Sequence, residues 1–99
     1  MAKYVFLINW TEQGIHEYQD TTKRAERARE WARSLGGDVK EFYWTLGPYD
    51  LVAVAEFPDD ETVTAWGLKV GALGAVRTTT LRAFNTEEIR PIVERSTSV

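Results

Sequence analysis

The strongest restriction on the fold comes from residues 3–11, Lys-Tyr-Val-Phe-Leu-Ile-Asn-Trp-Thr. They are mostly β-branched or aromatic, and both alternating sets of side chains are largely apolar, which is typical of a strand covered on both faces. One set points to one face and the other set to the opposite face. The first set is Tyr4, Phe6, Ile8 and Trp10, and the second is Val5, Leu7 and Asn9. We therefore expect a central strand with apolar material on each side.

Two segments have the three- and four-residue spacing of apolar positions that predicts amphipathic helices. The first is residues 22–35, with Thr21 as its N-cap and a Gly-Gly pair at its end. Its apolar positions are Ala25, Ala28, Trp31, Ala32 and Leu35. The second begins near Asp59, which can cap it and is followed by acidic residues that suit the positive end of the helix dipole. We expect it to end at Gly74.

The remaining strand-like segments are residues 38–46, 51–57 and 76–84. The first two are separated by Gly-Pro-Tyr-Asp at 47–50, a tight turn that predicts an antiparallel hairpin. The third is rich in β-branched residues.

The connecting segments have no such periodicity. Residues 12–20 are polar and predict a loop. After Asn85 we expect a short helical turn, and Pro91 argues against one continuous terminal helix.

The order β-α-β-β-α-β predicts an α+β, ferredoxin-like fold for a single domain over residues 1–99. Right-handed crossovers place both helices on one face of a four-stranded antiparallel sheet. The other face would then leave apolar and aromatic side chains in water, and a patch of that size usually marks an interface. Two such sheets packed face to face, about 10 Å apart, bury both patches. We therefore expect a homodimer or a higher homo-oligomer.

Composition excludes several function classes. The chain has 12 Lys and Arg against 15 Asp and Glu, a net charge of −3, which disfavours nucleic acid and anionic membranes as partners. The absence of cysteine removes disulfides, thiolate metal sites and cysteine nucleophiles. We expect no phosphate-binding glycine loop, no signal peptide and no membrane span, and therefore cytoplasmic residence.

Residues 40–54, Lys-Glu-Phe-Tyr-Trp-Thr-Leu-Gly-Pro-Tyr-Asp-Leu-Val-Ala-Val, resemble the signature of the GYD family, which is named for a Gly-Tyr-Asp turn. Here Pro48 lies between Gly47 and Tyr49, and His16 stands where many relatives have arginine. Further matching segments are 9–14, 24–26, 35–37, 58–60 and 74–84. The resemblance implies a ferredoxin-like fold of the dimeric α/β-barrel type. It leaves the activity open, because such barrels include monooxygenases, isomerases, haem enzymes and effector-binding modules.

The weak catalytic candidates are His16 and Asp50. His16 is the only histidine, and histidine is the side chain whose ordinary pKa lies closest to neutrality. It is also compatible with an exposed loop histidine, and as a lone residue it is weak support for haem, so we expect no metal or cofactor. Asp50 can orient His16 or a substrate hydroxyl, or it can bind backbone amides of its own turn.

The candidate ligand-binding residues are Trp10, Tyr43, Tyr49 and Thr80. Strand alternation places Tyr43 and its neighbour Trp44 on opposite faces, so at most one of them shares a chamber with Trp10. Aromatic residues at strand spacing also suit a core or an interface. Thr80 belongs to the run Arg-Thr-Thr-Thr, which suits an anion or hydroxyl site, although threonine is common in strands.

Two hypotheses of function remain open at this point. In the first, the oligomer encloses an apolar barrel cavity that binds a small organic molecule, with enzymatic turnover as one option. Glu41 or Glu56 would act as a base there if it pointed into a closed barrel. In the second, the protein is a non-catalytic oligomerisation or ligand-sensing module. A cavity holding His16, Tyr43 or a carboxylate favours the first hypothesis, and its absence favours the second.

Overall fold

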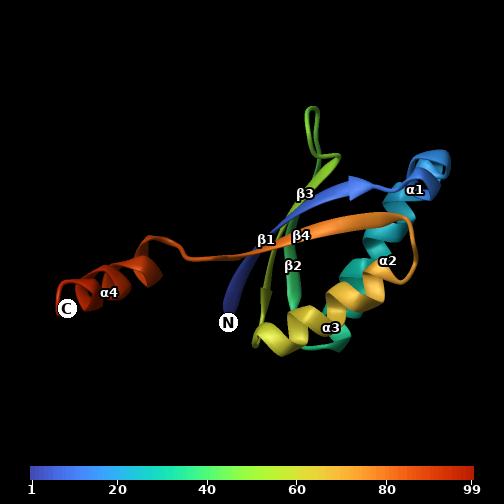
Figure 1. Ribbon diagram of the computed structural model, residues 1–99. Helices are drawn as coiled ribbons and strands as arrows, with labels where there is room; N and C mark the ends of the chain where they lie inside the picture. Colours follow the sequence, from blue (N-terminus) through green and yellow to red (C-terminus); the bar gives the residue numbers. More distant parts are fainter.

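The computed structural model describes residues 1–99 and contains one open antiparallel sheet of strand order β2-β3-β1-β4 (Figure 1). The strands are β1 (Ala2–Trp10), β2 (Asp38–Trp44), β3 (Leu51–Phe57) and β4 (Val76–Ala83). The helices are α1 (Glu12–His16), the 3₁₀ helix η1 (Tyr18–Asp20), α2 (Thr21–Ser34), α3 (Asp60–Gly71) and α4 (Thr86–Ser96). Helices α2 and α3 cover the same face of the sheet (Figure 1). The predicted ferredoxin-like fold is thereby confirmed.

The core lies between this covered face and the two helices. Phe6 of β1 pairs with Ala53 of β3 and Thr80 of β4, and these three side chains point to the helices. Because side chains alternate along a strand, every second residue of β1 points the same way. Tyr4, Phe6 and Ile8 are buried, as the alternation predicts. Small residues on the inner side of α2 allow it to lie close to the sheet. These are Ala25, Ala28 and Ala32.

Trp66 of α3 is the largest fully buried side chain and joins both helices to the sheet. Its ring centroid lies 5.0 Å from that of Phe6 and 5.3 Å from that of Phe57. Its indole N–H donates to the carbonyl of Ala28 in α2, 2.9 Å away, so the one polar atom of the ring is satisfied. Trp66 is thus a structural residue.

The two edges of the sheet differ. β2 carries a β-bulge between Val39 and Glu41, where the pairing with β3 shifts register. Lys40, the residue at the bulge, forms an ion pair with Asp38 at 2.9 Å. β4, at the other edge, pairs regularly with β1 along its length.

Residues 12–20 form α1 and η1, so the predicted loop is wrong. Thr11 caps α1, because its hydroxyl accepts a hydrogen bond from the Gly14 N–H at 3.1 Å. The expected role of Thr21 as a cap is also wrong. α2 begins at Thr21 itself, and the Thr21 hydroxyl accepts instead from the indole N–H of Trp44 at 3.0 Å.

The terminal helix is continuous through Pro91, contrary to expectation. Asn85 and Glu88 form a capping box that satisfies two backbone N–H groups at the start of α4. The proline removes the one hydrogen bond that would have gone to the carbonyl of Glu87. Glu87 is exposed, so water can take that place and the helix continues.

Tyr4 provides a test of the core at high pH. Its hydroxyl donates to Oδ1 of Asp60, the first residue of α3, at 2.5 Å. Burial, together with the neighbouring Asp60, raises the pKa of Tyr4 to about 12 from 10.0. The resulting stabilisation is complete below pH 10 and is lost as the pH rises towards 12, because the unfolded chain ionises first.

We therefore expect Tyr4→Phe to lose less stability than the wild type between pH 10 and 12, by roughly 1–2 kcal/mol. Urea unfolding at each pH measures the difference. Lysine deprotonation affects both proteins equally, so parallel curves for the two proteins would contradict the prediction.

Candidate functional site

An apolar, partly enclosed pocket (the main pocket) lies between the covered face of the sheet and helices α2 and α3. Fifteen residues line it, and twelve of them are hydrophobic. They include Ile8, Trp10, Trp31, Phe42, Leu51 and Val76, and the polar members are Thr21, Arg24 and Thr78. Its volume of about 50 Å³ holds a few waters or a molecule of a few heavy atoms. Sites for drug-sized ligands start at roughly 300 Å³.

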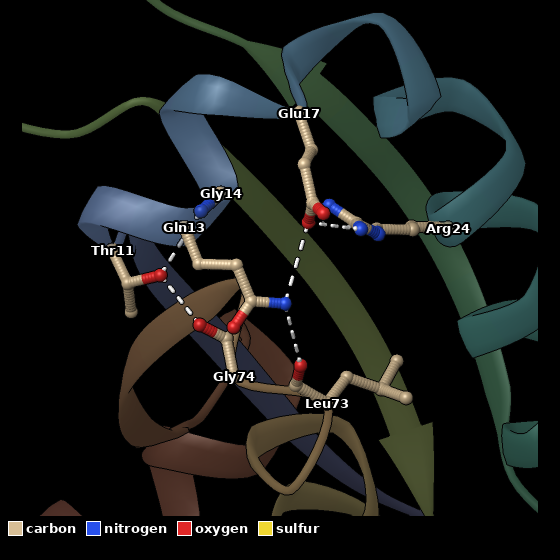
Figure 2. A network of polar contacts seen from close by, with 7 residues as sticks. All are labelled: Thr11, Gln13, Gly14, Glu17, Arg24, Leu73 and Gly74. Atoms are coloured by element: carbon tan, nitrogen blue, oxygen red, sulfur yellow. Dashed lines mark hydrogen bonds and ion pairs between the residues drawn. The ribbon is translucent and has the colours of Figure 1, made fainter.

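Arg24 is the only charged side chain in the pocket lining, and Glu17 balances it. The Arg24 guanidinium donates to Oε1 of Glu17 at 2.7 Å, and this bond holds the pKa of Glu17 below its usual value. Gln13 donates to the same oxygen at 3.3 Å and to the carbonyl of Leu73, also at 3.3 Å (Figure 2). The network joins α1, α2 and the turn after α3, and so orders the rim of the pocket.

A second set of contacts fixes α1 against the start of β4. The Thr11 hydroxyl donates to the carbonyl of Gly74 while it caps the Gly14 N–H (Figure 2). The Thr11 N–H donates to the carbonyl of Ala75 at 3.0 Å. Gly14 is buried there, and a Cβ added to it would lie 1.9 Å from the carbonyl oxygen of Ala75. Only glycine fits at this position. Thr11, a residue type that favours a helix N-cap, is the local sequence signal for α1.

The two catalytic candidates have separate surroundings. His16 is exposed in the last turn of α1 and is not part of the pocket lining. The Asp50 carboxylate accepts the backbone N–H of Trp10 at 2.9 Å, and the Asp50 N–H donates to the carbonyl of Ile8 at 2.9 Å. Asp50 therefore fixes the end of β1 to the start of β3, and no hydrogen bond joins it to His16.

The four ligand-binding candidates lie in different places. Trp10 lines the main pocket. Tyr43 points to the uncovered face, where its hydroxyl donates to Glu41 at 2.9 Å, a bond that raises the pKa of Tyr43. Tyr49 lies in the β2–β3 turn, and its carbonyl accepts from the Thr45 hydroxyl at 2.6 Å. Thr80 lines a separate, more open hollow of about 240 Å³ beside α3, which only five residues line.

The uncovered face is the face of the sheet opposite α2 and α3, and no helix packs on it (Figure 1). Its centre is apolar and is formed by β1, β3 and β4. The apolar side chains are Val5, Leu7, Val52, Val54 and Leu81. Charged residues surround them, with Lys3 opposite Glu56, Arg77 on β4 and Glu41 on β2. An apolar centre with a mixed-charge margin is typical of a protein interface.

The structure contains no group of three or more His, Asp or Glu side chains placed to hold a metal ion. None of its helices has the length and apolar character that a bilayer crossing requires.

The family model of the GYD domain matches residues 4–93. This chain belongs to the GYD family. A curated relative from Thermus thermophilus is 33% identical over 85 residues, which cover 85% of this chain and 90% of the relative. That protein is named glutamine synthetase and cystathionine β-lyase binding protein. A crystal structure of a Thermus thermophilus protein is 30% identical and has a TM-score of 0.56. The alignment covers 87% of this chain and 96% of that one.

The turn that resembles the signature of the GYD family has a structural role in this member. Gly47 has a φ of +113°, a conformation that favours glycine. The Thr45 N–H donates to the carbonyl of Asp50 at 2.9 Å, which closes the turn. Together with the two bonds from Asp50 to β1, these contacts set the register of the hairpin against the central strand.

Proposed function

We propose that this GYD-family protein is a non-catalytic interaction protein that works as a homo-oligomer, with two sheets packed through their uncovered faces as a dimeric α/β barrel. The observation that carries the proposal is the apolar centre of the uncovered face. A second copy offers the same apolar centre, so burying one buries both. The margin also suits self-association, because Lys3 and Arg77 can face Glu41 and Glu56 of a second copy.

The main pocket supports a binding role over a catalytic one. Its lining contains no histidine and no carboxylate, and Arg24 is already paired with Glu17. An acid–base reaction requires at least one group that can exchange a proton near neutral pH. The candidates His16 and Asp50 lie outside this lining, and we assign them no part in a reaction.

The name of the Thermus relative suggests the class of partner. That protein is named for binding two enzymes, glutamine synthetase and cystathionine β-lyase. We propose that the present chain likewise binds an enzyme of amino-acid metabolism, with the oligomer presenting two copies of each surface. Biolayer interferometry against the glutamine synthetase and the cystathionine β-lyase of its own organism tests this. Binding of neither enzyme would contradict the assignment of the partner and leave the homo-oligomer as a separate question.

A second candidate function is binding of a small molecule in the main pocket. Trp10 and Trp31 provide apolar surface there, and Thr21 and Thr78 provide hydroxyl groups. The volume limits the ligand to a few heavy atoms unless α2 and α3 separate. Thr80, the exposed Tyr43 and the half-buried Tyr49 would take no part, because none of them lines the pocket.

Native mass spectrometry of the freshly purified protein tests both candidates together. We expect a complex of at least two 11.3 kDa chains, and a co-purified ligand would add its own mass. Sedimentation velocity over a wide range of concentrations gives the dissociation constant. A protein that stays monomeric at high concentration would contradict the homo-oligomer.

A further inference from the structure

Helix α4 stands apart from the rest of the protein (Figure 1). No residue of α4 is buried. The longest dimension of the molecule is 52 Å and its radius of gyration is 15.1 Å, whereas a compact domain of this size has a radius of about 13 Å. An isolated helix of 11 residues is marginally stable in water. We therefore expect α4 to be stabilised by packing against another molecule.

One side of α4 is apolar. Ile89, Ile92 and Val93 follow the three- and four-residue spacing of a helix stripe, and they are 39%, 39% and 54% exposed. Glu87 and Glu94 lie on the opposite side of the helix. An amphipathic helix of this kind is typical of one that packs against apolar surface.

The direction of α4 is set by its own chain. Only Phe84 and Asn85 separate β4 from α4, and the capping box joins Asn85 to Glu88. Lys3 at the start of β1 forms an ion pair with Glu88 at 3.3 Å, and the Arg82 guanidinium lies 4.4 Å from the ring centroid of Phe84. Folding α4 back onto its own domain would break these contacts. Its apolar side is thus available to another molecule.

The accessible surface of the chain can be compared with the area that a stable dimer buries. The accessible surface is 6568 Å², against about 5,700 Å² expected for a compact monomer of 11.3 kDa. The excess of roughly 800 Å² is what each partner buries in an interface of standard size. In Figure 1, α4 lies on the side of the strands away from α2 and α3. A copy that covers the uncovered face would therefore come within reach of α4.

We infer that α4 is an arm that each protomer lays on a second copy of this chain, with Ile89, Ile92 and Val93 buried against that copy. The inference rests on the homo-oligomer proposed above and adds a second, reciprocal contact to it. The stability of the helix then depends on assembly, because only the second copy covers its apolar side.

Two matched double variants test the arm. Ile89→Gln with Ile92→Gln removes the apolar side, and Glu87→Gln with Glu94→Gln places the same two glutamines on the polar side, with loss of the exposed Glu87–Arg90 ion pair. Glutamine is a good helix former in both. Sedimentation velocity is expected to show a dimer dissociation constant at least about tenfold higher for the first variant, and a change within about threefold for the second. Equal dissociation constants would overturn the arm.

Hydrogen exchange of the wild-type protein gives an independent readout. The amides of Ile92 and Val93 are expected to be protected above the dissociation constant and to lose that protection on dilution below it. Protection that persists in the monomer, or that is absent in the dimer, would overturn the arm while leaving the face-to-face dimer in place. A wild type that is monomeric at every concentration would contradict the proposed homo-oligomer itself.

Discussion

Replacing Gly14 with alanine is expected to lower the free energy of unfolding by about 3 kcal/mol, one of the largest effects available to a single methyl group. The added Cβ would lie 1.9 Å from the carbonyl oxygen of Ala75 and 3.2 Å from the Trp10 ring. The first contact is with backbone, so no side-chain rotation relieves it. α1 must move away from β4, which also breaks the bonds from Thr11 to Gly74 and Ala75. The melting temperature is expected to fall by roughly 10–20 °C.

Gly67→Ala is the matched control for this change. Gly67 lies inside α3, and a Cβ there meets no atom within 4 Å. Alanine in a helix interior is more favourable than glycine by about 0.5–1 kcal/mol, so this variant is expected to be slightly more stable than the wild type. Thermal unfolding followed by circular dichroism compares the three proteins. A Gly14→Ala protein as stable as the wild type would show that α1 does not lie against Ala75.

Leu81→Asp is expected to convert the dimer to a monomer at micromolar concentration. Leu81 lies on the uncovered face and is 44% exposed in the single chain, so the protomer still folds. In the face-to-face dimer the new carboxylate would be buried without a partner, once from each copy. We expect the dissociation constant to rise at least about 100-fold, since an unpaired buried charge costs several kcal/mol.

Leu68→Asp provides the same chemical change away from the interface. Leu68 is 72% exposed on α3, which packs on the opposite face of the sheet. Its dissociation constant is expected to equal that of the wild type. Sedimentation velocity measures all three proteins, and circular dichroism verifies that both variants are folded. Equal behaviour of the two variants would rule out the uncovered face as the contact.

The fold could be predicted because alternation and spacing each restrict the chain strongly. The two-residue period of residues 3–11 placed Tyr4, Phe6 and Ile8 on one face, and the structure confirms that they are buried. The Gly-Pro-Tyr-Asp turn is too short to connect parallel strands, so it predicts that β2 and β3 form an antiparallel hairpin. The helical start after Asn85 could be predicted, but the full length of α4 could not, because Pro91 argues against a continuous helix. Asn85 with Glu88 three residues later is the pattern that reveals that start.

The site was less predictable because it depends on how distant segments meet. Alternation placed Trp10 on the covered face, but the pocket beside it forms only when α2 and α3 pack there. The sequence left two roles open for Asp50. Its bond to the backbone of Trp10 joins residues 40 apart in the chain, which no local pattern indicates. The ion pair between Arg24 and Glu17 could likewise not be predicted from the sequence, because it forms only when α1 packs beside α2.

The bulge in β2 limits how far the sheet can be extended by strands of other chains. A neighbouring strand can add to a sheet only where backbone N–H and carbonyl groups are evenly spaced, and the bulge at Val39 and Glu41 interrupts that spacing. The charged side chains of Asp38 and Lys40 at the same edge further disfavour pairing with a strand of another chain. Strand addition is therefore restricted to the β4 edge. Two chains that pair through their β4 strands form one continuous sheet, and both of its outer edges are then bulged β2 strands. Repeated strand addition into one continuous β-ribbon is therefore blocked in this chain.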